Sequence, residues 1–165
     1  MKLIIMACSA TKKPDDGEMP AIDRYDGPMW RTLRAQLQRT PEAKAATLSG
    51  ELLIWVVSAR YGFFDAVATP IRDYDQKMTP VRMAKMLACP SYDLQRIRSF
   101  VDDADAVLFA GGELYRNAMW KASGGRRSTI MKIDETDGAG IGEHRAQLAA
   151  WISFQYGAAP SGVAA

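Results

Sequence analysis

Small and polar residues follow apolar runs at four places in the sequence: 8–13, 58–62, 111–115 and 134–142. An apolar run without polar alternation is typical of a strand buried in a parallel sheet. Parallel sheets bind ligands at the carboxyl ends of their strands, so we expect these segments to meet at one site. The candidate ligand-binding residues are Cys8, Ser9, Tyr25, Ser58, Arg60, Tyr61, Tyr74, Gly111, Gly112 and Tyr115.

Three charged residues are candidates for catalysis. Asp75 is our first choice for a carboxylate that stabilises positive charge on a sugar, and Glu113 is the second. Lys12 would supply positive charge to a phosphate or to a departing base. Each also has a structural explanation: Glu113 favours the dipole of the helix that it begins, Asp75 is an ordinary loop residue, and Lys12 is a solvated residue after a strand. This chemistry requires no metal ion and no other cofactor, and we predict none.

Several familiar sites do not fit the sequence. The segment MACSATKK (6–13) lacks the glycines of a Walker A loop, and Gly111-Gly112 is not a GxGxxG fingerprint. With two cysteines and one histidine in the chain, neither a Cys/His zinc site nor a Ser-His-Asp triad is expected. We expect His144 to be exposed to solvent and Cys8 to be a small buried residue rather than a nucleophile.

Composition places the chain among ordinary globular proteins. It has 165 residues, 48% of them hydrophobic, and a formal net charge of +2, which is too low for a non-specific nucleic-acid binder. The apolar run before Cys8 is shorter than the core of an export signal, and no stretch is long enough to span a membrane. We therefore expect a cytoplasmic protein with free thiols and no membrane partner; the sequence does not indicate its oligomeric state.

Apolar runs and helical patterns alternate along the chain, which predicts an α/β fold: a single-domain, three-layer arrangement with a mostly parallel sheet of four or five strands. We expect this domain over residues 1–156 and a disordered tail over 157–165. The segments 9–27 and 63–78 are expected to be irregular. Strands are predicted over 2–8, 52–58, 105–110 and 128–133, and helices over 28–39 and from near Pro80, Ser91, Glu113 and Ile141.

Several segments, taken in order, resemble an uncharacterised family of phage and bacterial domains. They are Cys8-Ser9 with Lys12, then DRYDGPMWRTLRA, VVSARYGFFD, DYD and GGxxY, and together they cover most of residues 1–122. That family is distantly similar to YaaA-type peroxide-stress proteins and to an accessory domain of archaeal enzymes that modify 7-deazaguanine in transfer RNA. The residues on motif positions are Cys8, Ser9, Lys12, Tyr25, Pro28, Ser58, Ala59, Tyr61, Gly62, Tyr74, Asp75, Gly111, Gly112 and Tyr115. At position 61 this chain has tyrosine where the family frequently has histidine.

The resemblance implies a role with nucleic acids or nucleobases. We expect a nucleotide- or nucleobase-binding protein that acts on a DNA base or on its N-glycosidic bond. One alternative is a non-catalytic DNA-binding protein of a phage or of a stress response, with phosphate contacts from Arg126-Arg127 and from the Arg31, Arg34 and Arg39 face of the first long helix. Another alternative is a hydrolase or transferase of small nucleotides.

Overall fold

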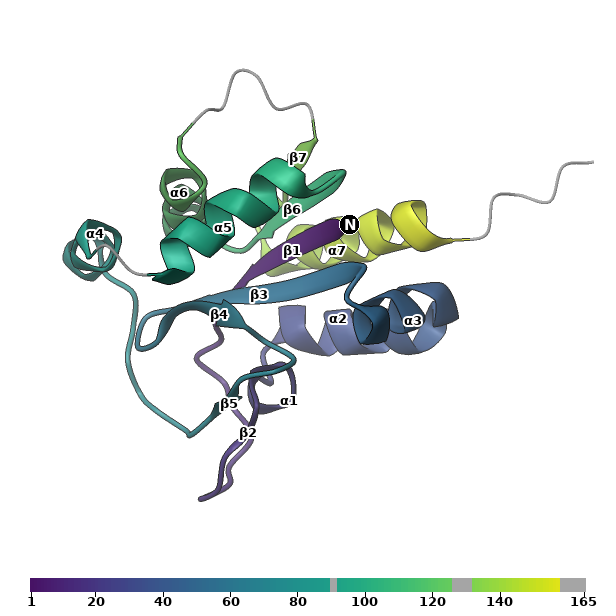
Figure 1. Ribbon diagram of the computed structural model, residues 1–165. Coiled ribbons are helices and arrows are strands. Elements are labelled where there is room, and N and C mark those ends of the chain that lie inside the picture. Colours follow the sequence, from purple (N-terminus) through teal and green to yellow (C-terminus); the bar gives the residue numbers. More distant parts are fainter. Residues whose placement is uncertain (90–91, 126–131, 158–165) are drawn as a thin grey trace, which may run out of the picture.

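The computed structural model describes residues 1–89, 92–125 and 132–157. Its centre is a five-stranded sheet in the order β4-β3-β1-β6-β7, with every neighbouring pair parallel except β3 and β4 (Figure 1). The strands are β1 (Lys2–Ala7), β3 (Leu52–Ser58), β4 (Gly62–Asp65), β6 (Ala106–Ala110) and β7 (Ile133–Glu135). The predicted α/β class with a mostly parallel sheet is confirmed.

Helices cover both faces of the sheet, which makes three layers. One face carries α2 (Pro28–Arg39), α3 (Pro41–Ser49) and α7 (Ile141–Tyr156). The other carries α4 (Pro80–Ala88), α5 (Tyr92–Asp103) and α6 (Glu113–Ala122). Because side chains alternate along a strand, the apolar run of β1 serves both cores: Ile4 and Met6 pack under α2 and α7, and Leu3 and Ile5 pack under α5 and α6.

Three predicted strands and four predicted helix starts lie in the described residues, and their elements form close to the expected bounds. The start of α4 forms as predicted, since the Thr79 side chain accepts a hydrogen bond from the Arg82 N–H at 3.2 Å. Ser91, near which a further helix is predicted to begin, lies outside the described residues, as do 126–131 and 158–165. The fourth strand is therefore described only as β7, which begins at the last residue of the predicted range.

Two segments expected to be irregular contain regular structure. Residues 62–65 form β4, which pairs with β3 through a tight hairpin, and α1 (Ala21–Arg24) lies within the loop 9–27. The short strands β2 (Met19–Pro20) and β5 (Pro70–Ile71) join these two loops as an antiparallel pair. The pairing depends on residues about fifty positions apart, which local sequence patterns do not reveal.

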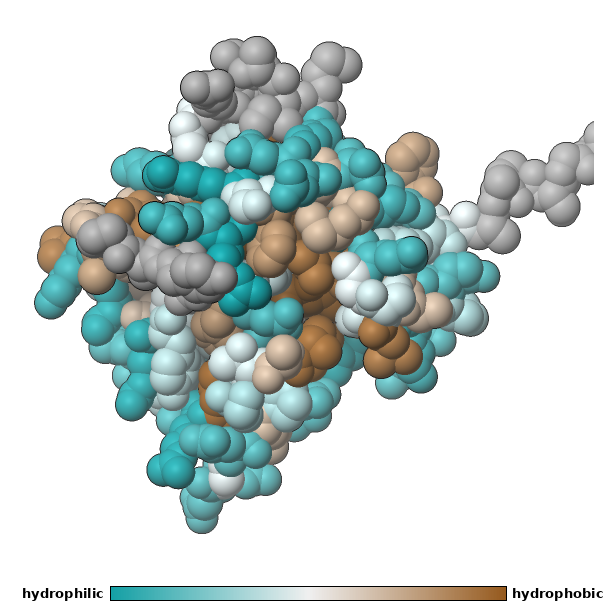
Figure 2. All heavy atoms as spheres, in the orientation of Figure 1, coloured by the Kyte–Doolittle hydropathy of each residue, from teal (hydrophilic) through white to brown (hydrophobic). Residues whose placement is uncertain are grey.

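The surface seen in Figure 2 is mostly hydrophilic, with hydrophobic side chains visible over the middle of the sheet. Within the described residues, no helix combines the length and the apolar character that a membrane crossing requires.

Candidate functional site

A crevice opens at the carboxyl edge of the sheet between β1 and β6. The chain after β1 leads to α2 on one face, whereas β6 leads directly to α6 on the other face. Such a switch point is where open parallel sheets bind ligands. The crevice has a volume of about 400 Å³. Its walls are Ala7, Cys8, Ser9, Ala10, Gly27, Pro28, Met29, Trp30, Ala110, Gly111, Gly112, Tyr115, Ala139, Gly140, Ile141 and His144.

Close backbone approach shapes the floor of the crevice. A Cβ atom at Gly111 would lie 2.6 Å from the Cβ of Ala7, so only glycine fits beside β1 at this position. Trp30, at the start of α2, donates its indole N–H to the carbonyl oxygen of Ala7 at 2.9 Å. The last residue of β1 is thereby held between β6 and α2.

A side cavity of about 120 Å³ adjoins the crevice and shares Cys8, Ser9, Ala10 and Tyr115 with it. Lys12 and Asp75 also line this side cavity. We call the crevice and the side cavity together the cleft. Of the predicted site residues, the structure therefore brings seven together in the cleft: Cys8, Ser9, Lys12, Asp75, Gly111, Gly112 and Tyr115.

Lys12 is held in place by the segment that carries Asp75. Its Nζ donates to the carbonyl oxygen of Tyr74 at 2.7 Å and lies 4.1 Å from the centre of the Tyr74 ring. The backbone of Lys12 also forms an antiparallel bridge with Tyr25. These contacts hold Lys12 in the side cavity that the exposed Asp75 also lines.

A chain of buried hydroxyl groups lies behind this wall. The Tyr74 hydroxyl is 2.7 Å from both the Ser58 Oγ and the Tyr25 hydroxyl. Ser58 Oγ accepts the backbone N–H groups of Arg60 and Tyr61, so its own proton is donated to Tyr74. Tyr74 then donates to Tyr25. The chain ties the exit of β3 to the segment before Asp75.

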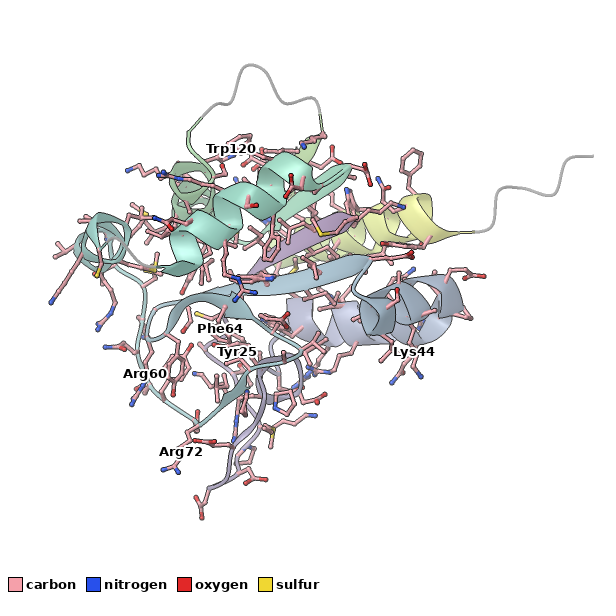
Figure 3. All side chains as sticks on the ribbon, in the orientation of Figure 1. Tyr25, Lys44, Arg60, Phe64, Arg72 and Trp120 are labelled. Atoms are coloured by element: carbon pink, nitrogen blue, oxygen red, sulfur yellow. The ribbon has the colours of Figure 1, made fainter. Side chains whose placement is uncertain are left out.

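Ser58 and Tyr25 are fully buried, so both position the cleft without contacting a ligand directly. Figure 3 shows Tyr25 close to the sheet, whereas Arg60 extends away from it on the same side. Burial raises the pKa of Tyr25 and of Tyr74 well above the ordinary value for tyrosine. The hydroxyl chain therefore stays protonated across the physiological range of pH.

Tyr115 and Cys8 form the wall shared by the two parts of the cleft. The Tyr115 hydroxyl lies 3.4 Å from the Cys8 Sγ. Burial raises the pKa of Tyr115, with a further contribution from the neighbouring Cys8 thiol. Cys8 is half-buried rather than enclosed in the core, and neither it nor Cys89 is in a disulfide. The cleft thus presents a protonated phenol and a thiol.

Arg60 and Tyr61 do not join the cleft. They line a separate cavity of about 570 Å³ between the β3–β4 turn and α4, together with Arg82 and Lys85. Tyr61 still contacts the cleft wall indirectly, since its ring packs edge-on against Tyr74 with centroids 5.3 Å apart. Glu113 is exposed in the first turn of α6 and is not among the residues that line the cleft.

His144 was expected to be exposed to solvent, and that prediction is wrong. Only 8% of its surface is exposed, and it lines the crevice. The N-terminal part of α7 packs beside the exit of β7, where Thr136 lies 2.9 Å from the His144 Nδ1. The Thr136 hydroxyl also accepts the Gly111 N–H at 3.1 Å. Histidine and threonine thus support the glycine turn after β6.

Two arginines of the predicted basic face serve the structure instead. Arg34 donates to backbone carbonyls and, like Arg31, pairs with Asp26 at 2.7 Å. Hydrogen bonding to Arg31 lowers the pKa of Asp26. Arg39 is exposed, and Arg126-Arg127 lie outside the described residues. Arg116 does not line the crevice; it donates to the carbonyl oxygen of Gly111 at 2.7 Å and pairs with Glu135.

No group of three His, Cys, Asp or Glu side chains suited to a metal ion occurs among residues 1–89, 92–125 and 132–157. A scan against models of protein families finds no match to the chain, and a search of curated proteins finds none either. The resemblance seen in the motifs therefore remains a prediction.

Proposed function

We propose that the cleft binds a nucleobase or nucleotide and that the protein acts on the base or on its N-glycosidic bond. The observation that supports this most is the meeting of Lys12 and Asp75 in one cavity, beside the phenol of Tyr115. These residues lie more than a hundred positions apart at the extremes, yet they share one small space at the carboxyl edge of the sheet.

Cleavage of an N-glycosidic bond separates charge in a way that this pair suits. As the C1′–N bond breaks, positive charge develops on the sugar and negative charge on the departing base. The Asp75 carboxylate would stabilise the sugar cation and the Lys12 ammonium the departing base. Water then adds to C1′, and the base leaves with a proton. The Tyr115 hydroxyl, protonated at neutral pH, is a hydrogen-bond donor for a base edge.

The test is to incubate the protein with deoxynucleosides, their 5′-monophosphates and a short single strand of DNA, and to measure free base by chromatography. We expect Asp75→Asn to keep the fold, by circular dichroism, and to lose activity by about a hundredfold or more. Lys12→Ala should weaken binding. Asp16→Asn, which changes an exposed loop carboxylate, is the matched control. Release of no base from any substrate would refute cleavage of the N-glycosidic bond.

The same assay with free nucleotides covers the alternative of a small-molecule hydrolase or transferase. A second candidate, binding of nucleic acid without catalysis, is favoured by the cavity of Arg60, Tyr61, Arg82 and Lys85. No carboxylate of the described residues pairs with these three cations. Phosphate contacts there would make the affinity for DNA fall steeply with salt. The unpaired cysteines suit a protein of the cytoplasm.

A further inference from the structure

Three helices begin at the crevice, and each has a glycine at its N-cap. Gly27, Gly112 and Gly140 precede α2, α6 and α7, and all three line the crevice. None of these caps provides a side-chain hydrogen bond to its helix. The helices α3 and α4 begin elsewhere and have threonine at this position; the Thr79 side chain caps α4, whereas Thr40 makes no side-chain hydrogen bond to α3.

The glycine caps leave backbone donors open. Two N–H groups in the first turn of each helix have no acceptor among the described residues. They belong to Met29, Trp30, Glu113, Leu114, Ile141 and Gly142, and of these Met29, Trp30 and Ile141 line the crevice. The start of a helix also carries a partial positive charge, so open N–H groups at such a start favour a bound anion. Here the starts of three helices of at least ten residues face one crevice.

His144 is a second, independent sign of an anion. It is more than nine-tenths buried, and its Nε2 has no partner among the described residues. Thr136 is fully buried, and the only described acceptor near its hydroxyl proton is the His144 Nδ1. With Nδ1 accepting that proton, the imidazole proton resides on Nε2, which is then a donor available to the crevice.

We infer that this end of the crevice binds a phosphate monoester, which makes the ligand of the cleft a phosphorylated nucleoside. The identity of the nucleoside part rests on the proposed function. A monoester has three unesterified oxygens, and three helix starts border the crevice through Gly27, Gly112 and Gly140, whereas a phosphodiester within a strand has two such oxygens. Glu113 and Glu143 lie in first turns but do not line the crevice, and the Glu143 carboxylate accepts the Ala139 N–H at 2.7 Å.

Gly140→Asp separates ligand binding from stability. A Cβ at Gly140 meets no atom within 4 Å, and the residue has a φ of −147°, so a side chain fits. Aspartate at an N-cap accepts first-turn N–H groups and stabilises the helix. It also places a negative charge where the phosphate would bind. We expect an equal or higher melting temperature and affinity for inorganic phosphate at least about tenfold weaker. Gly140→Asn caps the helix without adding charge, so we expect it to lose less affinity for inorganic phosphate than Gly140→Asp.

Two variants of His144 separate the roles of its ring atoms Nδ1 and Nε2. In His144→Asn the amide replaces Nδ1, which keeps a partner for Thr136 and removes the donor to the crevice. In His144→Gln the amide reaches the Nε2 position. We expect the asparagine variant to bind inorganic phosphate several-fold more weakly than the glutamine variant, although it preserves the buried contact better. The opposite order would mean that His144 has only a structural role and would overturn its part in the site.

Calorimetry with inorganic phosphate, a deoxynucleoside, its 5′-monophosphate, and an oligonucleotide with and without a 5′-phosphate completes the test. The inference predicts that the monophosphate binds more tightly than the nucleoside, and that Gly140→Asp removes the difference. If the nucleoside and its 5′-monophosphate bind equally well, the phosphate site is overturned and the proposed function still stands. If inorganic phosphate binds but neither the nucleoside nor the nucleotide does, the phosphate site is supported and the proposed function is overturned. Equal binding of the two oligonucleotides overturns the monoester assignment.

Discussion

Removal of the Tyr74 hydroxyl should destabilise the protein, because this group is the middle of the buried hydroxyl chain. Tyr74→Phe keeps the ring against Tyr25 and Tyr61 but breaks two hydrogen bonds of 2.7 Å. It leaves the Ser58 proton without an acceptor and the Tyr25 oxygen without a donor. Two lost bonds and a buried unsatisfied donor together cost about 2–4 kcal/mol of unfolding free energy. Urea denaturation followed by circular dichroism measures this cost.

Tyr61→Phe is the matched control for this experiment. The Tyr61 ring also packs against Tyr74, but the residue is 38% exposed and its hydroxyl has no hydrogen bond within the described part of the chain. We expect its unfolding free energy to change by less than about 0.5 kcal/mol. Adding Tyr25→Phe to Tyr74→Phe should lower the unfolding free energy little further, because Tyr74→Phe has already removed the hydrogen bond between the two hydroxyl groups. A Tyr74→Phe change as small as that of the control would refute the hydroxyl chain.

The remaining predictions concern close packing, helix capping and pH. Gly111→Ala should lower the unfolding free energy by about 1–3 kcal/mol in a urea titration, because its methyl group would collide with Ala7. Thr79→Ala should cost about 1 kcal/mol in the same titration through loss of the cap on α4, and no change would contradict the capping bond. Stability should fall as the pH rises above about 10, because the folded protein retains the tyrosine protons of the cleft that the unfolded chain releases. Urea titrations between pH 8 and 11 measure this fall, and a flat profile would contradict it.

The elements that could be predicted from the sequence are those with a strong local signal. The run Leu52–Ser58 is a strand at the predicted residues, since a continuous apolar segment of that length is buried on both faces. Helix α3 gave no such signal. Its buried residues are Ala43 and Ala46, which are too small to make an apolar stripe. The strand β4 was missed because its four residues are stable only when paired with β3.

Some residues of the candidate site could likewise be predicted from local sequence patterns, and others could not. The strand exits predicted that Cys8, Gly111 and Gly112 would meet, because parallel strands end on a common edge. No local pattern indicated how Asp75 reaches that edge, which depends on the hydroxyl chain of Tyr74. His144 was missed because a histidine in the first turns of a glycine-rich helix start suggests exposure. Its burial comes from Thr136 on a different element.

The glycine caps connect the fold to the chemistry proposed for the cleft. A serine or aspartate at Gly112 or Gly140 would meet no steric obstacle and would cap its helix somewhat better. The chain forgoes that small gain at the crevice, whereas the Thr79 side chain caps α4. Neither packing nor a positive φ requires glycine at position 112 or 140. At Gly27, by contrast, a side chain would collide with Ser9, so packing alone requires glycine there. The two unconstrained glycines, Gly112 and Gly140, are therefore the stronger indication that the open N–H groups of the crevice serve a ligand.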